Sequence, residues 1–369
     1  MRLTEEQVIK QLWESADQYK PLTFAGFEET LLFSERTKAD AVVRISVEDG
    51  LAFTALVEIV PVATPKNILQ KSRSLRAQLT EAGKSAFVPV ILAPYVGGAA
   101  APILAREGIS WIDLSGNMRV SVPGKIYIER TGNKNKFPDT APIKKIFEGT
   151  SSLVSRALIL KPDGFSSQYE LLDFINSRSA NITPGTVSRV LGSLENELLI
   201  TKDRSRIYVN DTERLLDKLA DGYTNYTRRK QRRVYKFAVQ KPTCVSMRLN
   251  FNTPSNYLAC GFYATQIKGL AATDEVTIFV KDLEQAKKDF DFIIPDSEFG
   301  DFKLIETKDT EIWFNSNEVQ LTMASVIRVS IPVVDDLELY LEMMSDAPRG
   351  PKVAKLLKER ILGVRDCER

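Results

Sequence analysis

Hydrophobic residues in the first third of the chain follow both helical and strand-like spacing. The helical segments are residues 4–19, 65–82 and 99–107, and the strand-like segments are residues 41–47, 52–60, 87–93, 110–113 and 126–129. Continuous apolar strands separated by a helix are typical of a sheet that is buried on both faces. The polar segment 131–141, which contains two prolines, is the best linker in the sequence. We therefore predict an α/β domain over residues 1–135.

Residues 142–222 carry three helical patterns in succession, at residues 151–160, 167–177 and 183–198. Thr183 and Pro184 are a favourable N-cap and first residue for the third helix. Two short strand patterns, residues 199–201 and 206–209, then flank a polar tip. Three helices followed by a hairpin is the order of a winged helix-turn-helix, which we predict for residues 142–222.

The third helix of such a module enters the major groove of DNA and presents its N-terminal residues to base edges. The hairpin tip reaches phosphates or the minor groove. On this basis the predicted DNA contacts are the outward residues of the third helix and of the hairpin: Thr186, Ser188, Arg189, Ser193, Lys202, Arg204 and Arg206. The alternative is a three-helix domain that binds another protein.

Charge is unevenly distributed along the chain, although the formal net charge is only +2. Residues 149–241 hold 16 Lys and Arg against 10 Asp and Glu, whereas residues 242–369 hold 15 against 21. Residues 223–241 contain no acid and seven cations, namely Arg228, Arg229, Lys230, Arg232, Arg233, Lys236 and Lys241. Neighbouring cations repel each other unless acids or a polyanion neutralise them. We therefore predict that this basic connector, residues 223–241, binds DNA. The alternative is a solvated helix face.

The sequence contains no histidine, and its three cysteines, Cys244, Cys260 and Cys367, have no CxxC spacing. This excludes Ser-His-Asp and Cys-His catalysis, the usual zinc sites and a disulfide framework. We predict no cofactor and no metal, with carboxylate-bound magnesium as the remaining plausible catalytic metal. No apolar run approaches the ~20 residues of a membrane span, and the N-terminus lacks a signal core. We therefore expect a cytoplasmic protein with no membrane partner.

Two acids in the first domain are candidates for catalysis. Asp40 opens one strand pattern and Glu58 lies near the end of the next. The PD-(D/E)xK nuclease core has the same order of elements: a helix, a strand with Asp, a strand with Glu and a second helix. In that core the acids bind magnesium, and a lysine two residues after the Glu helps to activate water. Val60 occupies that position, and we do not favour Lys66 or Lys71 as its substitute. We predict an inactive restriction-endonuclease-like domain; the alternative is a magnesium-dependent DNA nuclease targeted by the winged helix.

A second unusual segment of this domain is WIDLSGN, residues 111–117, in which Asp113 comes shortly before Ser-Gly-Asn. A structural Asx turn explains it at least as well as a functional role.

Residues 242–369 are predicted to form a second α/β domain. The expected strands are residues 276–280 and 291–294, and the expected helices are residues 255–266, 337–344 and 352–362. A glycine-containing helix before an acidic strand is similar to a nucleotidyltransferase core. Cys260-Gly261-Phe262 lacks the serine of that core, however, and the adjacent Asp274 and Glu275 would point to opposite faces of a strand. We expect no catalysis here.

Near the C-terminus, the sequence DDLELYLEMM (residues 335–344) is followed by Arg349-Gly350 and a helix. Together with the predicted winged helix, these residues resemble the AbiEi-type antitoxins of type IV toxin–antitoxin systems and related regulators. The segments VEIV (57–60) and WIDLSGN resemble longer members that add a nuclease-like domain. The chain differs from the shortest members in having a domain before the winged helix.

The resemblance implies a DNA-binding regulator of transcription that represses its own operon and counters a nucleotidyltransferase-type toxin. The partners expected from it are double-stranded DNA and the cognate toxin. A regulator of this kind would bind as a homodimer or at repeated sites. The chain would then be an α+β multidomain protein and not an enzyme. The third hypothesis, beside the regulator and the nuclease, is a protein–protein adaptor.

Overall fold

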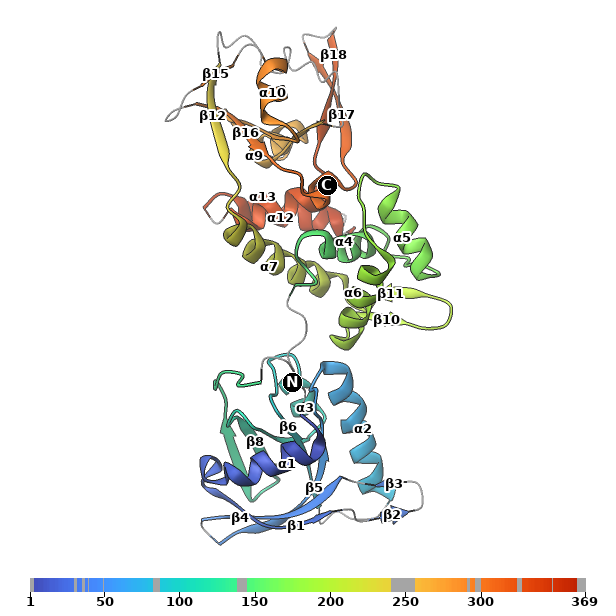
Figure 1. Cartoon of the computed structure of the whole chain (residues 1–369), viewed down its shortest axis with the longest axis vertical. Helices are drawn as coiled ribbons and strands as arrows, with labels where there is room; N and C mark the ends of the chain where they lie inside the picture. Colours follow the sequence, from blue (N-terminus) through green and yellow to red (C-terminus); the bar gives the residue numbers. More distant parts are fainter. Residues whose placement is uncertain are drawn as a thin grey trace, which may run out of the picture. The chain divides into compact units, whose positions relative to one another are not determined.

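The computed structural model describes residues 3–29, 32–34, 37–38, 40–48, 50–81, 87–137, 145–239, 256–290, 293–295, 300–323, 327–346 and 348–363. The protein is α+β, and its chain divides into two compact units (Figure 1). The first unit comprises residues 1–143 and 193–198, and the second comprises residues 144–192 and 199–369. Each unit contains its own seven-stranded mixed sheet.

The first sheet has the strand order β1-β4-β5-β6-β7-β8-β9. Its strands are β1 (Leu22–Glu29), β4 (Ala41–Val47), β5 (Ala52–Ile59), β6 (Phe87–Ala93), β7 (Ser110–Asp113), β8 (Met118–Val122) and β9 (Ile126–Arg130). β5, β6 and β7 are parallel, and the flanking pairs are antiparallel. The helices are α1 (Glu5–Glu14), the 3-10 helix η1 (Ala16–Tyr19), α2 (Pro65–Glu81) and α3 (Ala101–Arg106), and β2 (Leu32–Ser34) pairs with β3 (Thr37–Lys38).

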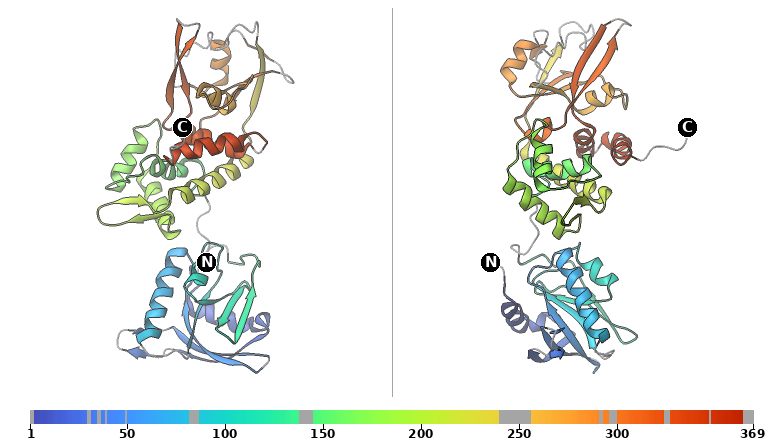
Figure 2. Two further views of the ribbon diagram at one scale, coloured as in Figure 1. Left: turned by 180° about the vertical axis from the view of Figure 1, so that it is seen from behind. Right: turned by 90° about the vertical axis from the view of Figure 1, so that its right-hand side faces the viewer.

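Helices cover both faces of this sheet (Figure 2). Alternate residues of β6 point to opposite faces: Val90 and Leu92 join the core that contains Leu12 of α1. Ile91 joins the core that contains Ile68 of α2. The predicted sheet buried on both faces is therefore confirmed.

The second unit begins with the 3-10 helix η3 (Gly149–Ser151) and the helices α4 (Ser152–Leu160), α5 (Gln168–Asn176) and α6 (Pro184–Asn196), of which residues 184–192 belong to this unit. The hairpin of β10 (Ile200–Lys202) and β11 (Ile207–Val209) follows, and then the 19-residue helix α7 (Thr212–Lys230). Apolar side chains at helical spacing are buried in each helix, for example Leu153, Leu171 and Val190. The three predicted helices and the hairpin are thus present.

The second sheet has the strand order β15-β12-β16-β14-β13-β18-β17. Its strands are β12 (Val234–Val239), β13 (Tyr257–Ala259), β14 (Val276–Val280), β15 (Ile293–Pro295), β16 (Phe302–Glu306), β17 (Asn317–Met323) and β18 (Ile327–Val333). The helices are α9 (Gly261–Ile267), α10 (Leu283–Asp289), α11 (Thr310–Trp313), α12 (Asp336–Ser345) and α13 (Gly350–Ile361). No described helix combines the length and apolar character that a membrane crossing requires.

Two predictions for this half of the chain need correction. The helix expected over residues 255–266 is strand β13 followed by α9, because Tyr257, Leu258 and Ala259 are all buried in the sheet. The expected connector, residues 223–241, is the end of α7 followed by β12, so the predicted boundary at residue 222 lies inside a helix.

The expected strand 291–294 is described only from Ile293 onward. Cys260 is buried, and Cys244 and Cys367 lie outside the described residues.

Candidate functional site

The hairpin β10–β11 pairs with a residue from the loop between α4 and α5. The Phe165 N–H donates to the Ile207 carbonyl at 2.9 Å, and the Ile207 N–H donates to the Phe165 carbonyl at 2.7 Å. Gly164 has φ +79°, and a Cβ there would lie 2.3 Å from the Ile207 carbonyl oxygen. Only glycine fits this close approach. The sequence indicated a turn at this point but not the pairing, because a one-residue bridge leaves no alternating pattern.

The start of α6 presents polar side chains to solvent. The Thr186 N–H donates to Thr183 Oγ1 at 3.3 Å, which caps the helix as predicted. Ser188 and Arg189 are exposed, and Thr186 is partly exposed. Ser193 is 9 % exposed, so it is not one of the outward residues that the sequence pattern predicted.

The hairpin tip is organised by Asp203. Its Oδ1 accepts hydrogen bonds from the backbone N–H groups of Ser205 at 2.8 Å and Arg206 at 2.7 Å, and from Ser205 Oγ at 3.1 Å. These bonds, first that of the Ser205 backbone, lower the pKa of Asp203. Lys202 and Arg204 are exposed around this fixed turn. The tip therefore holds two cations in a defined position.

Arg206 has a structural contact that the sequence did not indicate. Its Nε donates to the Asp163 carbonyl at 2.7 Å, and a second guanidinium nitrogen donates to the same oxygen. Arg206 thus ties the hairpin to the loop that carries Gly164. The prediction that it lies at the hairpin and is exposed holds, but the guanidinium already has an acceptor within the protein.

The basic segment is less unbalanced than its sequence suggested. Arg229 pairs with Glu148, with an N–O distance of 2.5 Å. Lys230 and Arg232 both pair with Asp309, the latter at 3.4 Å. These acids come from distant parts of the chain, so the premise that the cations have no carboxylate partner is wrong.

The same segment also lies away from the hairpin. Two residues separate the end of β11 from the start of α7, and Arg228 is near the other end of this helix. At a rise of 1.5 Å per residue, these ends are separated by roughly 25 Å. Figure 1 shows α7 running away from the hairpin. Arg228 and Arg233 are exposed, and Lys241 lies outside the described residues. Four of the predicted DNA contacts are exposed, two on α6 and two at the hairpin tip: Ser188, Arg189, Lys202 and Arg204.

The two predicted acids of the first unit do come together. Ala41 is the register partner of Val57, which places Asp40 beside Glu58, and Asp40 Oδ2 accepts from the Ile59 N–H at 2.8 Å. Glu58 is 2 % exposed. Burial raises the pKa of Glu58, and Asp40 raises it further, while the hydrogen bond from Lys71 lowers it.

Lys71 and Gln78 of α2 complete this cluster. Lys71 Nζ lies 2.5 Å from Glu58 Oε2, and Gln78 Nε2 lies 3.5 Å from Glu58 Oε1. Val60, at the position of the missing lysine, is 3 % exposed and packs with apolar residues. A cation therefore reaches Glu58 from the next helix and not from its own strand. Within the described ranges, no group of three or more acids or cysteines is arranged to hold a metal ion.

Asp113 is a structural residue, as the Asx-turn interpretation predicted. Its carboxylate accepts from the backbone N–H groups of Ser115 at 2.9 Å, Asn117 at 2.9 Å and Val96 at 3.1 Å. Asp113 is fully buried, and these bonds fix the turn between β7 and β8. Burial raises the pKa of this carboxyl, and the bonds from Asn117 and the backbone oppose that effect.

No family model, curated protein or solved structure matches this chain.

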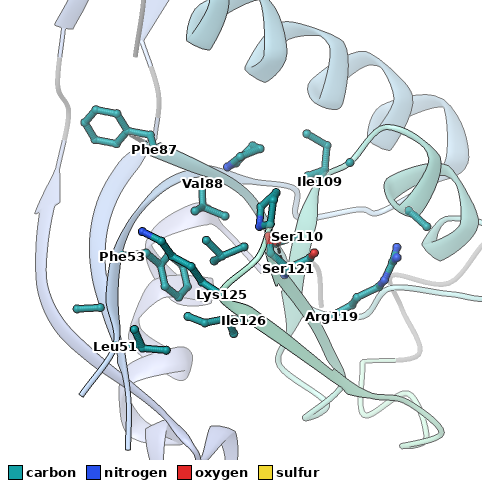
Figure 3. A pocket seen from close by; sticks show the side chains of 16 residues that line it. Leu51, Phe53, Phe87, Val88, Ile109, Ser110, Arg119, Ser121, Lys125 and Ile126 are labelled. Atoms are coloured by element: carbon teal, nitrogen blue, oxygen red, sulfur yellow. Dashed lines mark hydrogen bonds between the residues drawn. The ribbon is translucent and has the colours of Figure 1, made fainter. Parts of the chain in front are cut away.

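The first unit also has a hollow of about 610 Å³ (Figure 3). Apolar side chains such as Phe53, Val88 and Ile109 line it, together with the cations Arg119 and Lys125. It lies where β6 and β7 begin, whereas Glu58 is near the end of β5, to which they are parallel. The hollow is thus separate from the acidic cluster.

Proposed function

We propose that this protein is a regulator that binds double-stranded DNA through α6 and the hairpin β10–β11. The pairing of Phe165 with Ile207 carries this proposal, because it adds the small third strand of a winged helix to the three helices and the hairpin. In such a module α6 is the helix that enters the major groove. The exposed Ser188 and Arg189 lie on its N-terminal half, where base contacts are made.

The side chains suit two kinds of contact. Arg189 would donate two hydrogen bonds to guanine, and Ser188 and Thr186 would contact bases or phosphate. Lys202 and Arg204 would neutralise phosphates beside the groove. Asp203 carries negative charge, but its bonds to the tip backbone hold it within the turn.

Selection from a random duplex library, followed by footprinting on the promoter of the protein's own gene, tests the proposal. We expect retention of a defined site at 100 mM salt. A variant with Lys202→Ala and Arg204→Ala should lose affinity, whereas Lys355→Ala, a change at an exposed residue of α13 outside the proposed contacts, should not. If the full chain retains no duplex even at low salt, the module serves protein contacts and the proposal is wrong.

The resemblance of residues 335–350 to the AbiEi-type antitoxins extends the proposal. We infer repression of the protein's own operon and neutralisation of a nucleotidyltransferase-type toxin encoded beside it. Co-expression with the product of the adjacent gene is the test: rescue of growth supports the antitoxin role, and continued toxicity contradicts it.

A second candidate function is metal-dependent DNA cleavage, favoured by the contact of Lys71 with Glu58. Two carboxylates and a lysine are the residue types that bind magnesium and activate water in such nucleases. The competing explanation is that Lys71 neutralises a buried glutamate. Cleavage of plasmid DNA with magnesium or manganese, abolished by Glu58→Gln and by Lys71→Met, would establish the nuclease. Absence of cleavage with either metal would leave the cluster a structural one.

A further inference from the structure

Strand β17 lies at one margin of the second sheet, and β15 lies at the other (Figure 1). β17 pairs with β18 over all seven of its residues, from Asn317 opposite Val333 to Met323 opposite Ile327, without a register shift. No strand in the described part of the chain pairs with its other side. Every second residue of such a strand directs its backbone N–H and C=O groups outward. The outer side of β17 is therefore a template on which another strand could form a ladder of hydrogen bonds.

The other margins of the two seven-stranded sheets carry features that discourage such pairing. β1 has a register shift after Ala25, β9 ends in Glu129 and Arg130, and β15 has three residues, of which the last is Pro295. Bulges, charges, proline and short length all protect a sheet edge. β17 has a continuous register, no proline, no lysine or arginine, and one acid, Glu318. It is thus the least protected of these margins.

The apolar face of the second sheet continues onto β17 and is open there. Ile331 of β18 is fully buried, and its register partner Val319 lies on the same face of the sheet. Val319 and Leu321, two residues apart and so on one face, are only partly buried. The opposite face carries Glu318 and Gln320, which are exposed. A further strand beside β17 would cover Val319 and Leu321.

We propose that β17 pairs antiparallel with β17 of a second copy of this chain, with Gln320 at the two-fold axis. An axis through residue 320, the middle of the strand, brings all seven residues of both strands into register. It opposes Val319 of each copy to Leu321 of the other, so each apolar side chain gains an apolar neighbour. The two copies of Glu318 are then four residues apart along the strand, about 13 Å, which avoids direct opposition of like charge.

A second copy fits this edge because the edge is self-complementary. The sequence Val319-Gln320-Leu321 is apolar, polar and apolar, the same pattern in both directions. A two-fold interface requires this property, since each strand must pair with its own reversed copy. A strand from a different protein would require no such symmetry.

The dimer would carry two copies of α6 and of the hairpin β10–β11. A two-fold regulator of this kind reads two half-sites of a palindromic duplex. This consequence rests on the proposed function, whereas the pairing of β17 does not.

Size-exclusion chromatography of the full chain with light scattering tests the pairing. At 50 µM we expect twice the 41.4 kDa mass of the chain. Gln320→Lys and Gln320→Glu should each weaken dimerisation tenfold or more, because like charges would oppose each other at the axis. An equimolar mixture of these two variants should restore the dimer, because opposite charges then meet. The matched changes Gln266→Lys and Gln266→Glu, at an exposed residue of α9, should leave the dimer affinity unchanged within twofold.

Three results would overturn the proposal: a wild type that is monomeric at 200 µM, a Gln320→Lys variant that dimerises as well as the wild type, or a mixture of the two Gln320 variants that stays monomeric. Circular dichroism and the melting temperature check that every variant folds. No DNA is present in these measurements, so failure of the DNA-binding proposal leaves their result intact. A dimer that retains no duplex would contradict the proposed function alone.

Discussion

Arg156 of α4 and Glu338 of α12 form an ion pair of 2.7 Å in which both side chains are buried, at 1 % and 0 % exposure. The Tyr223 hydroxyl of α7 donates to the second carboxylate oxygen at 2.9 Å. The helical module and the C-terminal sheet domain therefore share a polar core. This explains why the two predicted domains belong to one compact unit.

We expect Arg156→Met to destabilise the second unit strongly. Removing one partner of a buried pair leaves an uncompensated charge, which costs about 3–5 kcal/mol. Adding Glu338→Leu should recover much of that loss, because an apolar pair of similar volume needs no compensation. Urea unfolding of the wild type, the single variant and the double variant measures this. A loss below about 1 kcal/mol for the single change would show that the pair is not needed for stability.

Gly164→Ala should disrupt the small sheet beside the hairpin. The added Cβ would meet the Ile207 carbonyl at 2.3 Å, and φ at this residue is +79°. We expect a lower melting temperature and weaker DNA binding. Gly192→Ala is the matched control: it lies inside α6 with no atom within 4 Å of the new Cβ, so a gain of about 0.5–1 kcal/mol is expected. Equal effects of the two changes would contradict this account.

Sequence patterns predicted the local elements of this protein well, because hydrophobic periodicity reflects which face of an element is buried. They predicted α1, α2 and the strands β4, β5 and β6 within a few residues. They failed at β13, where three consecutive buried residues precede a short helix. A short apolar run has no period that distinguishes a strand from the beginning of a helix.

The candidate sites were predicted less completely, because they depend on partners that are distant in sequence. Asp40 and Glu58 were identified from neighbouring strand patterns, but the contact of Lys71 with Glu58 depends on how α2 packs. The acid partner of Lys230 is Asp309, which lies 79 residues further along the chain. Local sequence could show the run of positive charge, but it could not show which acid folding would bring to it.

Arg189 and Arg204 should affect DNA binding in different ways. We expect Arg189→Ala to weaken binding to the selected site by about 1–3 kcal/mol and binding to random duplex much less, because a base contact is lost. Arg204→Ala should weaken both about equally and reduce the slope of log affinity against log salt by about 1. Fluorescence anisotropy on both duplexes over a salt series distinguishes them. If Arg189→Ala lowers both affinities equally, α6 does not contact bases.

Glu342→Gln should make the protein more stable at pH 8 than the wild type, with little difference at pH 5. Burial, followed by the nearby charge of Glu338, raises the pKa of Glu342 to about 8 in the folded protein, against an ordinary value of 4.5. Between these values the folded state holds a proton that the unfolded state has released, so the free energy of unfolding falls as pH rises through this window. Glutamine keeps an oxygen that can accept from the Gly261 N–H, which lies 3.0 Å from Glu342 Oε2.

The carboxyl of Asp335, with a pKa raised by burial to about 6, is present in both proteins and does not alter the difference between their stabilities. Urea unfolding at pH 5, 6.5 and 8 should show the two curves separating by roughly 1–3 kcal/mol at the highest pH. The exposed change Glu6→Gln should leave the pH dependence unaltered, and a constant offset at all three pH values would contradict the assignment to Glu342.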